Sequence, residues 1–207
     1  MSKTSETNLM RNFELPHVIA WTLVGLLTMV PVFLTLLQSV PNGAAGIAGI
    51  NKEISQLSGL VGTVLYAISL VLSTRLRFLE PMFGGLSRVY IAHHIVGALA
   101  FIGLMVHPLF VALALIPEGM RSAALSLIPN GLLPLSALFN THNLVHEAVL
   151  EQWAITFGII GFWGMVVMLM VTLFVKLPYQ LWLFIHKFLG VAFLISGLHI
   201  FFIYSDT

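Results

Sequence analysis

The sequence predicts an all-α membrane protein, a transmembrane helical bundle with five spans. Of its 207 residues, 58% are hydrophobic and only 8% are charged, whereas about a quarter of the residues in a soluble domain are charged. Five apolar segments are each long enough to cross a hydrocarbon core about 30 Å thick. We expect helices, because lipid cannot satisfy open backbone groups. The segments lie at about 17–40, 56–74, 89–116, 153–175 and 180–204.

The polar segment 1–16 precedes the first span and is predicted to be cytoplasmic. The first span is too long for a signal-peptide core, so we expect an uncleaved anchor. With this orientation the basic residues follow the positive-inside rule. Those on or near the cytoplasmic side are Lys3, Arg11, Arg75, Arg77, Arg88, Lys176 and Lys187, and those outside are Lys52 and Arg121. A multi-pass protein of the cell membrane is predicted, with the third and fifth spans both running from cytoplasm to exterior.

Segment 117–152 is predicted to be an exterior loop. It is longer than a simple connection needs, and its apolar part is broken by Pro129, Gly131 and Pro134. We therefore expect a cap or an interfacial helix there, not a sixth span.

The composition limits the chemistry. The chain has no cysteine, which excludes disulfides, Cys-ligated iron–sulfur clusters and the covalent attachment of a c-type haem. A net charge of +1 gives no indication of a nucleic-acid partner, and the lipid bilayer is the expected surrounding. Any metal chemistry must use histidine, carboxylate or methionine.

Two of the spans carry a related histidine pattern. The third contains "HHIVGALAFIGLMVH", and the fifth contains "HKFLGVAFLISGLH". Each begins with His-x-x-x-Gly and ends in a second histidine, so the pairs are His93 with His107 and His186 with His199. Ionisable side chains are costly inside a membrane and usually mark ligands or ion paths.

The spacing of the histidines predicts two haems. Fourteen residues of helix are close to four turns and about 21 Å, which places His93 and His107 near opposite edges of the hydrocarbon. Helices that run in the same direction would pair His93 with His186 on the inner side and His107 with His199 on the outer side. Imidazole is a good axial ligand for haem iron. Segment 17–204 is therefore predicted to be a haem-binding transmembrane domain with two bis-histidine b-type haems.

Other ligands fit the spacing less well. A single zinc or copper ion would need its ligands at one depth. A haem-free transporter of protons or metal ions, the alternative from another class, would be expected to have midplane acidic groups or discontinuous helices. The five spans have no acidic residue near their middle.

The thirteen residues from His186 to His199 are one fewer than in the third span. On an ideal helix this leaves the second imidazole about 140° from the first. The fifth span must tighten, kink or hold its two haems on different faces. A spacing of thirteen residues before His107, as in the fifth span, would make His94 the ligand in place of His93. We prefer His93 because the His-x-x-x-Gly match starts at His93.

Glycine and proline near the histidines have two interpretations each. Gly97 and Gly190 follow a proposed ligand by four residues, and either leave room for a porphyrin or let helices pack closely. Pro108 removes the helical donor for the Leu104 carbonyl, which would bend the helix at the outer site.

The segments "HHIVGALAFIGLMVHP" and "KLPYQLWLFIHKFLGVAFLISGLH", with the closing "YSDT", resemble the ferric reductase-like transmembrane domain. NADPH oxidases, ferric reductases and related bacterial electron-transfer proteins share this domain. The resemblance implies a pair of haem b groups that carry electrons outward from a cytoplasmic flavin. In that family the longer spacing begins at a histidine followed by a basic residue. This supports His93, with His94 in the position that Lys187 has after His186.

The resemblance also implies a membrane haem oxidoreductase of NAD(P)H oxidase or ferric reductase type. Its acceptor would be dioxygen, giving superoxide, or ferric iron. The chain has no Gly-rich dinucleotide fingerprint, so FAD and NAD(P)H are expected on a missing cytoplasmic flavoprotein domain or a separate subunit. We expect a truncated membrane domain, with a sixth span beyond the chain end. An alternative is a haem subunit that passes electrons to a separate periplasmic or extracellular protein.

Several polar residues are candidates for supporting roles. Arg75, Arg77 and Arg88 would lie near the inner haem and pair with its propionates, although the positive-inside bias alone would place them there. Arg121 is expected to pair with an outer propionate or to steer an anionic acceptor. A further pair, His142 and His146, would bind a metal ion, cover the outer haem, or belong to a solvated loop face.

Overall fold

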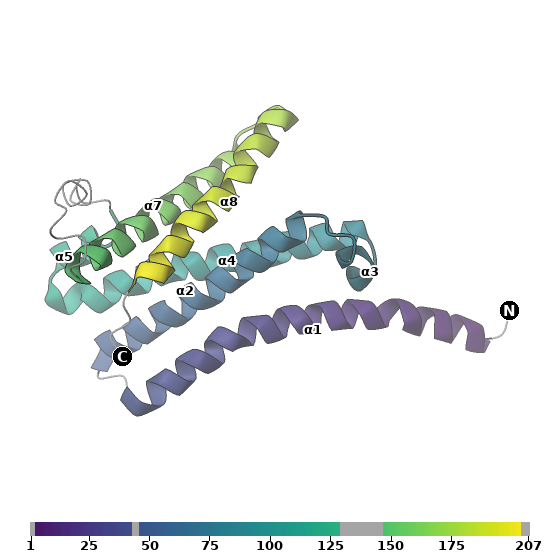
Figure 1. Ribbon diagram of the computed structural model, residues 1–207, viewed down its shortest axis with the longest axis horizontal. Coiled ribbons are helices and arrows are strands. Elements are labelled where there is room, and N and C mark those ends of the chain that lie inside the picture. The colour runs from purple at the N-terminus through teal and green to yellow at the C-terminus, as the bar shows by residue number, and fades with distance from the viewer. Residues whose placement is uncertain (1–2, 43–45, 129–146, 204–207) are drawn as a thin grey trace. The chain divides into compact units, whose positions relative to one another are not determined.

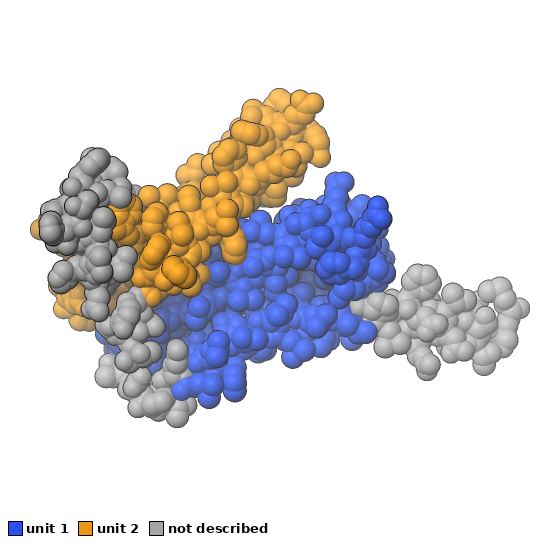
Figure 2. All heavy atoms as spheres, viewed as in Figure 1, with its two compact units in different colours: residues 1–110 blue, residues 111–207 orange. Residues whose placement is uncertain are grey.

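The computed structural model describes residues 3–42, 46–128 and 147–203, and within these ranges it contains helices and no strand. Five of the helices are long and apolar enough to cross a membrane, which confirms the predicted all-α membrane fold (Figure 1). The five candidate spans are His17–Leu37, Gly46–Ser73, Leu86–Glu118, Trp153–Phe174 and Tyr179–Phe202. The chain divides into two compact units, Met1–Phe110 and Val111–Thr207 (Figure 2).

The described residues of the first unit form four helices. These are α1 (Lys3–Asn42), α2 (Gly46–Ser73), α3 (Leu79–Phe83) and most of α4 (Leu86–Leu115). Helix α1 is long and gently curved (Figure 1), and it reaches α3 through an edge-to-face contact between Trp21 and Phe83. Helices α1 and α2 begin well before the apolar segments that the sequence marks. The turns before the apolar segments include charged residues, such as Lys3 in α1 and Lys52 in α2. These turns can be helical because the hydrogen bonds of a helix are internal and do not depend on lipid.

Helices α2 and α4 pack as an antiparallel pair. On α4 the contact face follows a spacing of 4 and 3 residues, the pattern of a coiled-coil seam. The α4 seam consists of Val89, His93, Val96, Ala100, Gly103 and His107, which includes three of the buried residues of this helix. The opposite α2 seam consists of Ser55, Gly59, Gly62, Tyr66 and Ser69. Two heptads separate His93 from His107, so both histidines face α2.

The second unit is built on another antiparallel pair. It contains the short helices η1 (Ile116–Glu118) and α5 (Met120–Leu125), followed by α7 (Glu147–Phe174) and α8 (Tyr179–Phe202). The indole nitrogen of Trp163 on α7 donates to the Leu127 carbonyl at 2.8 Å, which connects the segment after α5 to α7. Residues 129–146 of the predicted exterior loop, including Pro129, Gly131 and Pro134, lie outside the described residues, and the last six residues of the predicted loop are already part of α7.

Neither proline nor glycine interrupts the two histidine-bearing helices. Helix α4 continues through Pro108 to Leu115, and α8 continues through Gly190 and Gly197 to Phe202. Because α8 is uninterrupted, its thirteen-residue spacing leaves the two imidazoles on different faces of the helix.

Candidate cofactor site

His93 and His107 are held by main-chain oxygens of α2. Nδ1 of His93 lies 2.9 Å from the Ser69 carbonyl oxygen, and Nδ1 of His107 lies 2.9 Å from the Ser55 carbonyl oxygen. Ser55 and Ser69 are themselves fourteen residues apart, so the acceptors repeat the spacing of the histidines. Both serines are buried, each with 4% of its surface exposed.

These contacts determine the tautomer of both rings. A carbonyl oxygen can only accept a hydrogen bond, so Nδ1 must carry the proton. The basic lone pair is then on Nε2, the nitrogen through which such an imidazole would ligate a metal. Ligating histidines in proteins commonly donate their other ring nitrogen to a carbonyl or carboxylate, which fixes the ring and raises its basicity. The residues of this chain therefore fit the ligation of haem iron.

The hydroxyl of Ser69 adds a second interaction at the inner position. Its Oγ lies 3.0 Å from Nδ1 of His93 and donates to the His93 carbonyl oxygen at 3.3 Å. Ser69 therefore accepts from the ring and donates to the backbone of His93. At the outer position, Oγ of Ser55 lies 3.2 Å from Nδ1 of His107.

His199 is held in the same way in the second unit. Its Nδ1 lies 2.8 Å from the carbonyl oxygen of Ala154 on α7. Ala154 is completely buried, so the acceptor is shielded from water. By the same reasoning Nδ1 of His199 carries the proton and Nε2 is its basic nitrogen.

His186 has a different environment. Its ring stacks on Trp182, one turn earlier on α8, with ring centroids 5.0 Å apart and planes 7° from parallel. The indole nitrogen of Trp182 in turn donates to the Thr172 carbonyl on α7 at 3.2 Å. Trp182 therefore connects the His186 ring to the neighbouring helix.

His94 turns away from α2. Its Nδ1 lies 2.7 Å from the carbonyl oxygen of Tyr90, one turn earlier on its own helix, and the side chain is exposed. Of the two adjacent histidines, only His93 lies on the α4 seam. This contrast supports the choice of His93 as the proposed ligand.

The glycines near the histidines divide between the two interpretations. A Cβ added at Gly97 would lie 3.0 Å from Oγ of Ser69, so close helix packing explains this glycine. A Cβ added at Gly190 would meet no heavy atom within 4 Å. Room for a cofactor therefore stays a prediction for Gly190.

The proposed arginines are exposed at the ends of helices. Arg75 and Arg77 follow α2, and Arg88 is in the first turn of α4, so all three lie at the His93 end of this pair. The Arg75 guanidinium lies 5.5 Å from the centre of the Tyr90 ring. Arg121 lies on α5, beyond the opposite end of α4.

The described residues do not form a conventional metal site. Among them, no group of three or more His, Cys, Asp or Glu side chains comes close enough to hold one ion. Two ligands from different helices suffice for haem iron, so this result does not conflict with the proposed ligands. His142 and His146 lie outside the described residues.

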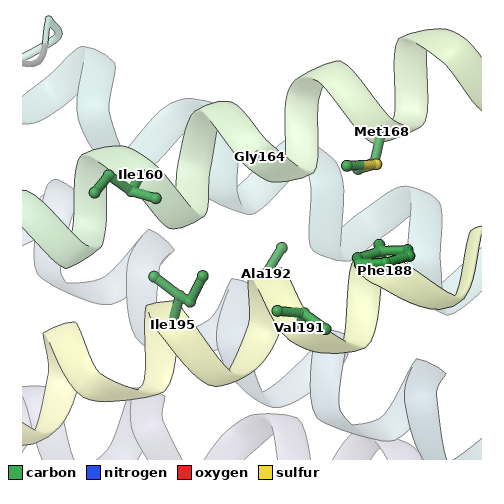
Figure 3. Close-up of a pocket in the computed structure, with 7 residues that line it drawn as sticks. All are labelled: Ile160, Gly164, Met168, Phe188, Val191, Ala192 and Ile195. Carbon is green, nitrogen blue, oxygen red and sulfur yellow. The ribbon is translucent and has the colours of Figure 1, made fainter. Parts of the chain in front are cut away.

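A small apolar pocket of about 110 Å³ lies between α7 and α8 (Figure 3). Gly164 of α7 and Ala192 of α8 leave this space because their side chains are small. The other lining residues are Ile160, Met168, Phe188, Val191 and Ile195. None of the histidines is among the residues that line this pocket, so it is distinct from the histidine contacts.

The residues that orient the histidines were not predicted from the sequence. They are Ser55, Gly59, Ser69, Ala154, Gly158 and Trp182. One signal was available, because Ser55 and Ser69 in the second span have the same fourteen-residue spacing as His93 and His107. The acceptor at Ala154 could not be found from the sequence, because it is a main-chain oxygen and does not depend on the identity of the side chain.

Five apolar helices with histidines held by main-chain oxygens define a helical membrane protein with intramembrane histidine sites. The chain belongs to the family of ferric reductase like transmembrane components, whose model matches residues 58–197. This match confirms the resemblance predicted from the histidine motifs. It includes His93, His107 and His186 and ends just before His199. No curated protein and no solved structure matches the chain. The family implies an oxidoreductase-type membrane domain and suggests transmembrane electron transfer.

Proposed function

We propose that this chain carries single electrons across the membrane through two b-type haems, each held by two histidines. His93 and His186 would ligate the inner haem, and His107 and His199 the outer one. Bound haem would supply the one-electron chemistry, while the protein positions and tunes it. The third and fifth spans run in the same direction if each of the five helices crosses once, which is what this pairing requires.

The observation that supports the proposal most directly is the bond from Nδ1 of His93, His107 and His199 to a main-chain oxygen. Each bond makes Nε2 the basic nitrogen and restrains the ring, as second-shell partners of metal ligands do. Proton transport through the same rings would require Nδ1 to pass its proton to its neighbour. A carbonyl oxygen does not accept a proton in this way, so the contacts favour ligation over transport.

The proposed orientation places the N-terminus in the cytoplasm of a cell-membrane protein. Arg75, Arg77 and Arg88 then lie on the cytoplasmic side, at the same end of the α2–α4 pair as His93. Exposed guanidinium groups in this position would pair with the propionates of the inner haem. Arg121 would act at the exterior, on an outer propionate or an anionic acceptor.

The donor would be a cytoplasmic flavoprotein domain or subunit with FAD and NAD(P)H. The acceptor would be dioxygen, giving superoxide, or ferric iron, as in an NAD(P)H oxidase or a ferric reductase. Family membership supports this direction of electron flow. A stimulation of oxygen uptake or of ferric-chelate reduction by added flavoprotein in inside-out vesicles would identify the acceptor.

An optical spectrum tests the proposal. Protein purified from haem-replete cells and reduced with dithionite is expected to show the bands of low-spin b-type haem. Extraction of the haem and its quantification against protein should give about two haems per chain. A colourless preparation with the expected helix content would contradict the assignment.

Ser69→Ala is expected to raise the midpoint potential of the inner haem by a few tens of millivolts. The variant removes one acceptor from Nδ1 of His93 but keeps the carbonyl. The ligand then becomes less basic and stabilises ferric iron less. A lost hydrogen bond of about 1 kcal/mol corresponds to roughly 40 mV for one electron. Potentiometric titration measures the shift, and an unchanged inner potential would argue against this role of the hydroxyl.

A further inference from the structure

Two short glycine pairs face the histidine-bearing helices, one pair in each unit. Gly-Leu-Val-Gly at 59–62 is part of α2, and Gly-Ile-Ile-Gly at 158–161 is part of α7. The first pair lies against the end of α4 that carries His107, and the second lies against the end of α8 that carries His199. These two histidines are the proposed ligands of the outer haem.

The first glycine of each pair lies against an imidazole ring. A Cβ added at Gly59 would be 2.7 Å from Nδ1 of His107, and 3.1 and 3.2 Å from its Cγ and Cε1. A Cβ added at Gly158 would be 2.7 Å from Nδ1 of His199, and 3.0 Å from each of the same two carbons. Contacts this short are repulsive, so alanine at either position would displace the ring.

The second glycine of each pair allows the two helices to pack closely. A Cβ added at Gly62 would lie 2.9 Å from Cγ of Leu104, and one added at Gly161 would overlap Oγ of Ser196. Leu104 and Ser196 each precede an outer histidine by three residues. The two antiparallel pairs therefore cross in the same register.

The hydrogen-bond acceptors complete the repeat. Ser55, which accepts from His107, precedes Gly59 by four residues, and Ala154, which accepts from His199, precedes Gly158 by four residues. Each ring thus lies over a glycine while its Nδ1 bonds to the carbonyl one turn earlier. Only a residue without a Cβ leaves space for this position of the ring.

We propose that Gly59 and Gly158 are matched positioning residues for the outer pair of histidines. By admitting the ring against the helix backbone, each glycine lets Nδ1 reach its carbonyl and thereby sets the direction of Nε2. This inference rests on the proposed function, and it predicts that the two outer ligands are held by equivalent supports from two different helices.

The inner histidines do not share this support. The residue four positions after Ser69, the acceptor for His93, is Ser73, and His186 stacks on Trp182. The glycine positions should therefore affect the outer haem selectively.

Single alanine variants test the selectivity. Gly59→Ala and Gly158→Ala are each expected to reduce the haem content from about two to about one per chain, or to shift the low-spin electron paramagnetic resonance signal of one haem only. Gly164→Ala is the matched control on α7, because its Cβ would meet only the Cβ of Ala192 at 3.9 Å. It should keep both haems and both signals. Two unchanged signals in both Gly59→Ala and Gly158→Ala would overturn the inference.

A double-mutant cycle tests the steric cause without relying on haem. Gly158→Ala is expected to lower the thermal stability of the detergent-solubilised chain when His199 is present. In a His199→Ala background the same change should be neutral or stabilising, because the ring is gone and alanine favours a helix. Equal destabilisation in both backgrounds would overturn the inference. Absence of haem from the unaltered chain would instead reject the proposed function, and this cycle would still report on the contact.

Discussion

His107→Ala and His199→Ala are each expected to remove the outer haem and to leave the inner one in place. The haem content should fall from about two to about one per chain, and electron transfer to an exterior acceptor should be abolished. The reason is distance, since the two histidines of α4 are about 21 Å apart along the helix. Loss of a ligand at one level therefore leaves the other level intact. Haem quantification and the reduced spectrum measure the result.

The adjacent histidine provides the control for this experiment. His94 is exposed and bonds to its own helix, so His94→Ala should retain both haems. His93→Ala and His186→Ala should remove the inner haem while sparing the outer one. Full haem content in His107→Ala, or a lost haem in His94→Ala, would contradict the proposed set of ligands.

Gly103→Leu is expected to cause the largest loss of stability in the first unit. A Cβ at this position would already lie 3.2 Å from Cα of Gly62 and 3.3 Å from the Ser58 carbonyl oxygen. Both atoms belong to the backbone of α2 and cannot move aside as a side chain would. Overpacking of this kind costs about 1–3 kcal/mol and occasionally more. The variant should therefore melt at a clearly lower temperature in detergent.

A glycine on α1 offers a comparison for the same substitution. No heavy atom lies within 4 Å of a Cβ added at Gly25, so Gly25→Leu should be neutral or slightly stabilising. Thermal unfolding followed by circular dichroism compares the two variants with the unaltered chain. Similar melting temperatures for all three would contradict the prediction, because they would show that α2 and α4 can move apart without loss of stability.

The five spans could be predicted because the length and apolarity of a segment decide whether it can cross lipid. The orientation of the α4 histidines toward one face also follows from sequence, since fourteen residues are two heptads of a packed helix. The helix ends could not be predicted in this way. Helix α2 begins at Gly46, before the apolar segment, and carries the charged Lys52 and Glu53 in its first two turns.

The partners of the histidines were harder to predict. A pattern within one helix indicates which side chains share a face, but it does not identify the helix that this face meets. Gly97 illustrates the limit, because its position after His93 is equally compatible with a porphyrin and with the Ser69 hydroxyl that the structure places there. The acceptor for His199 is a backbone atom of Ala154. The position of this oxygen depends on helix packing, so the side chain at 154 does not indicate it.

The use of backbone acceptors has a consequence for mutational scanning. Replacing side chains one at a time tests the hydroxyl of Ser69 but cannot delete the oxygen at position 154, where the residue is already alanine. Such a scan would report this position as silent even though it orients His199. Sequence drift at the acceptor would likewise be tolerated as long as the residue stays small. Replacing the amide by an ester through chemical synthesis, which weakens the carbonyl as an acceptor, would detect a contribution that genetic substitution cannot.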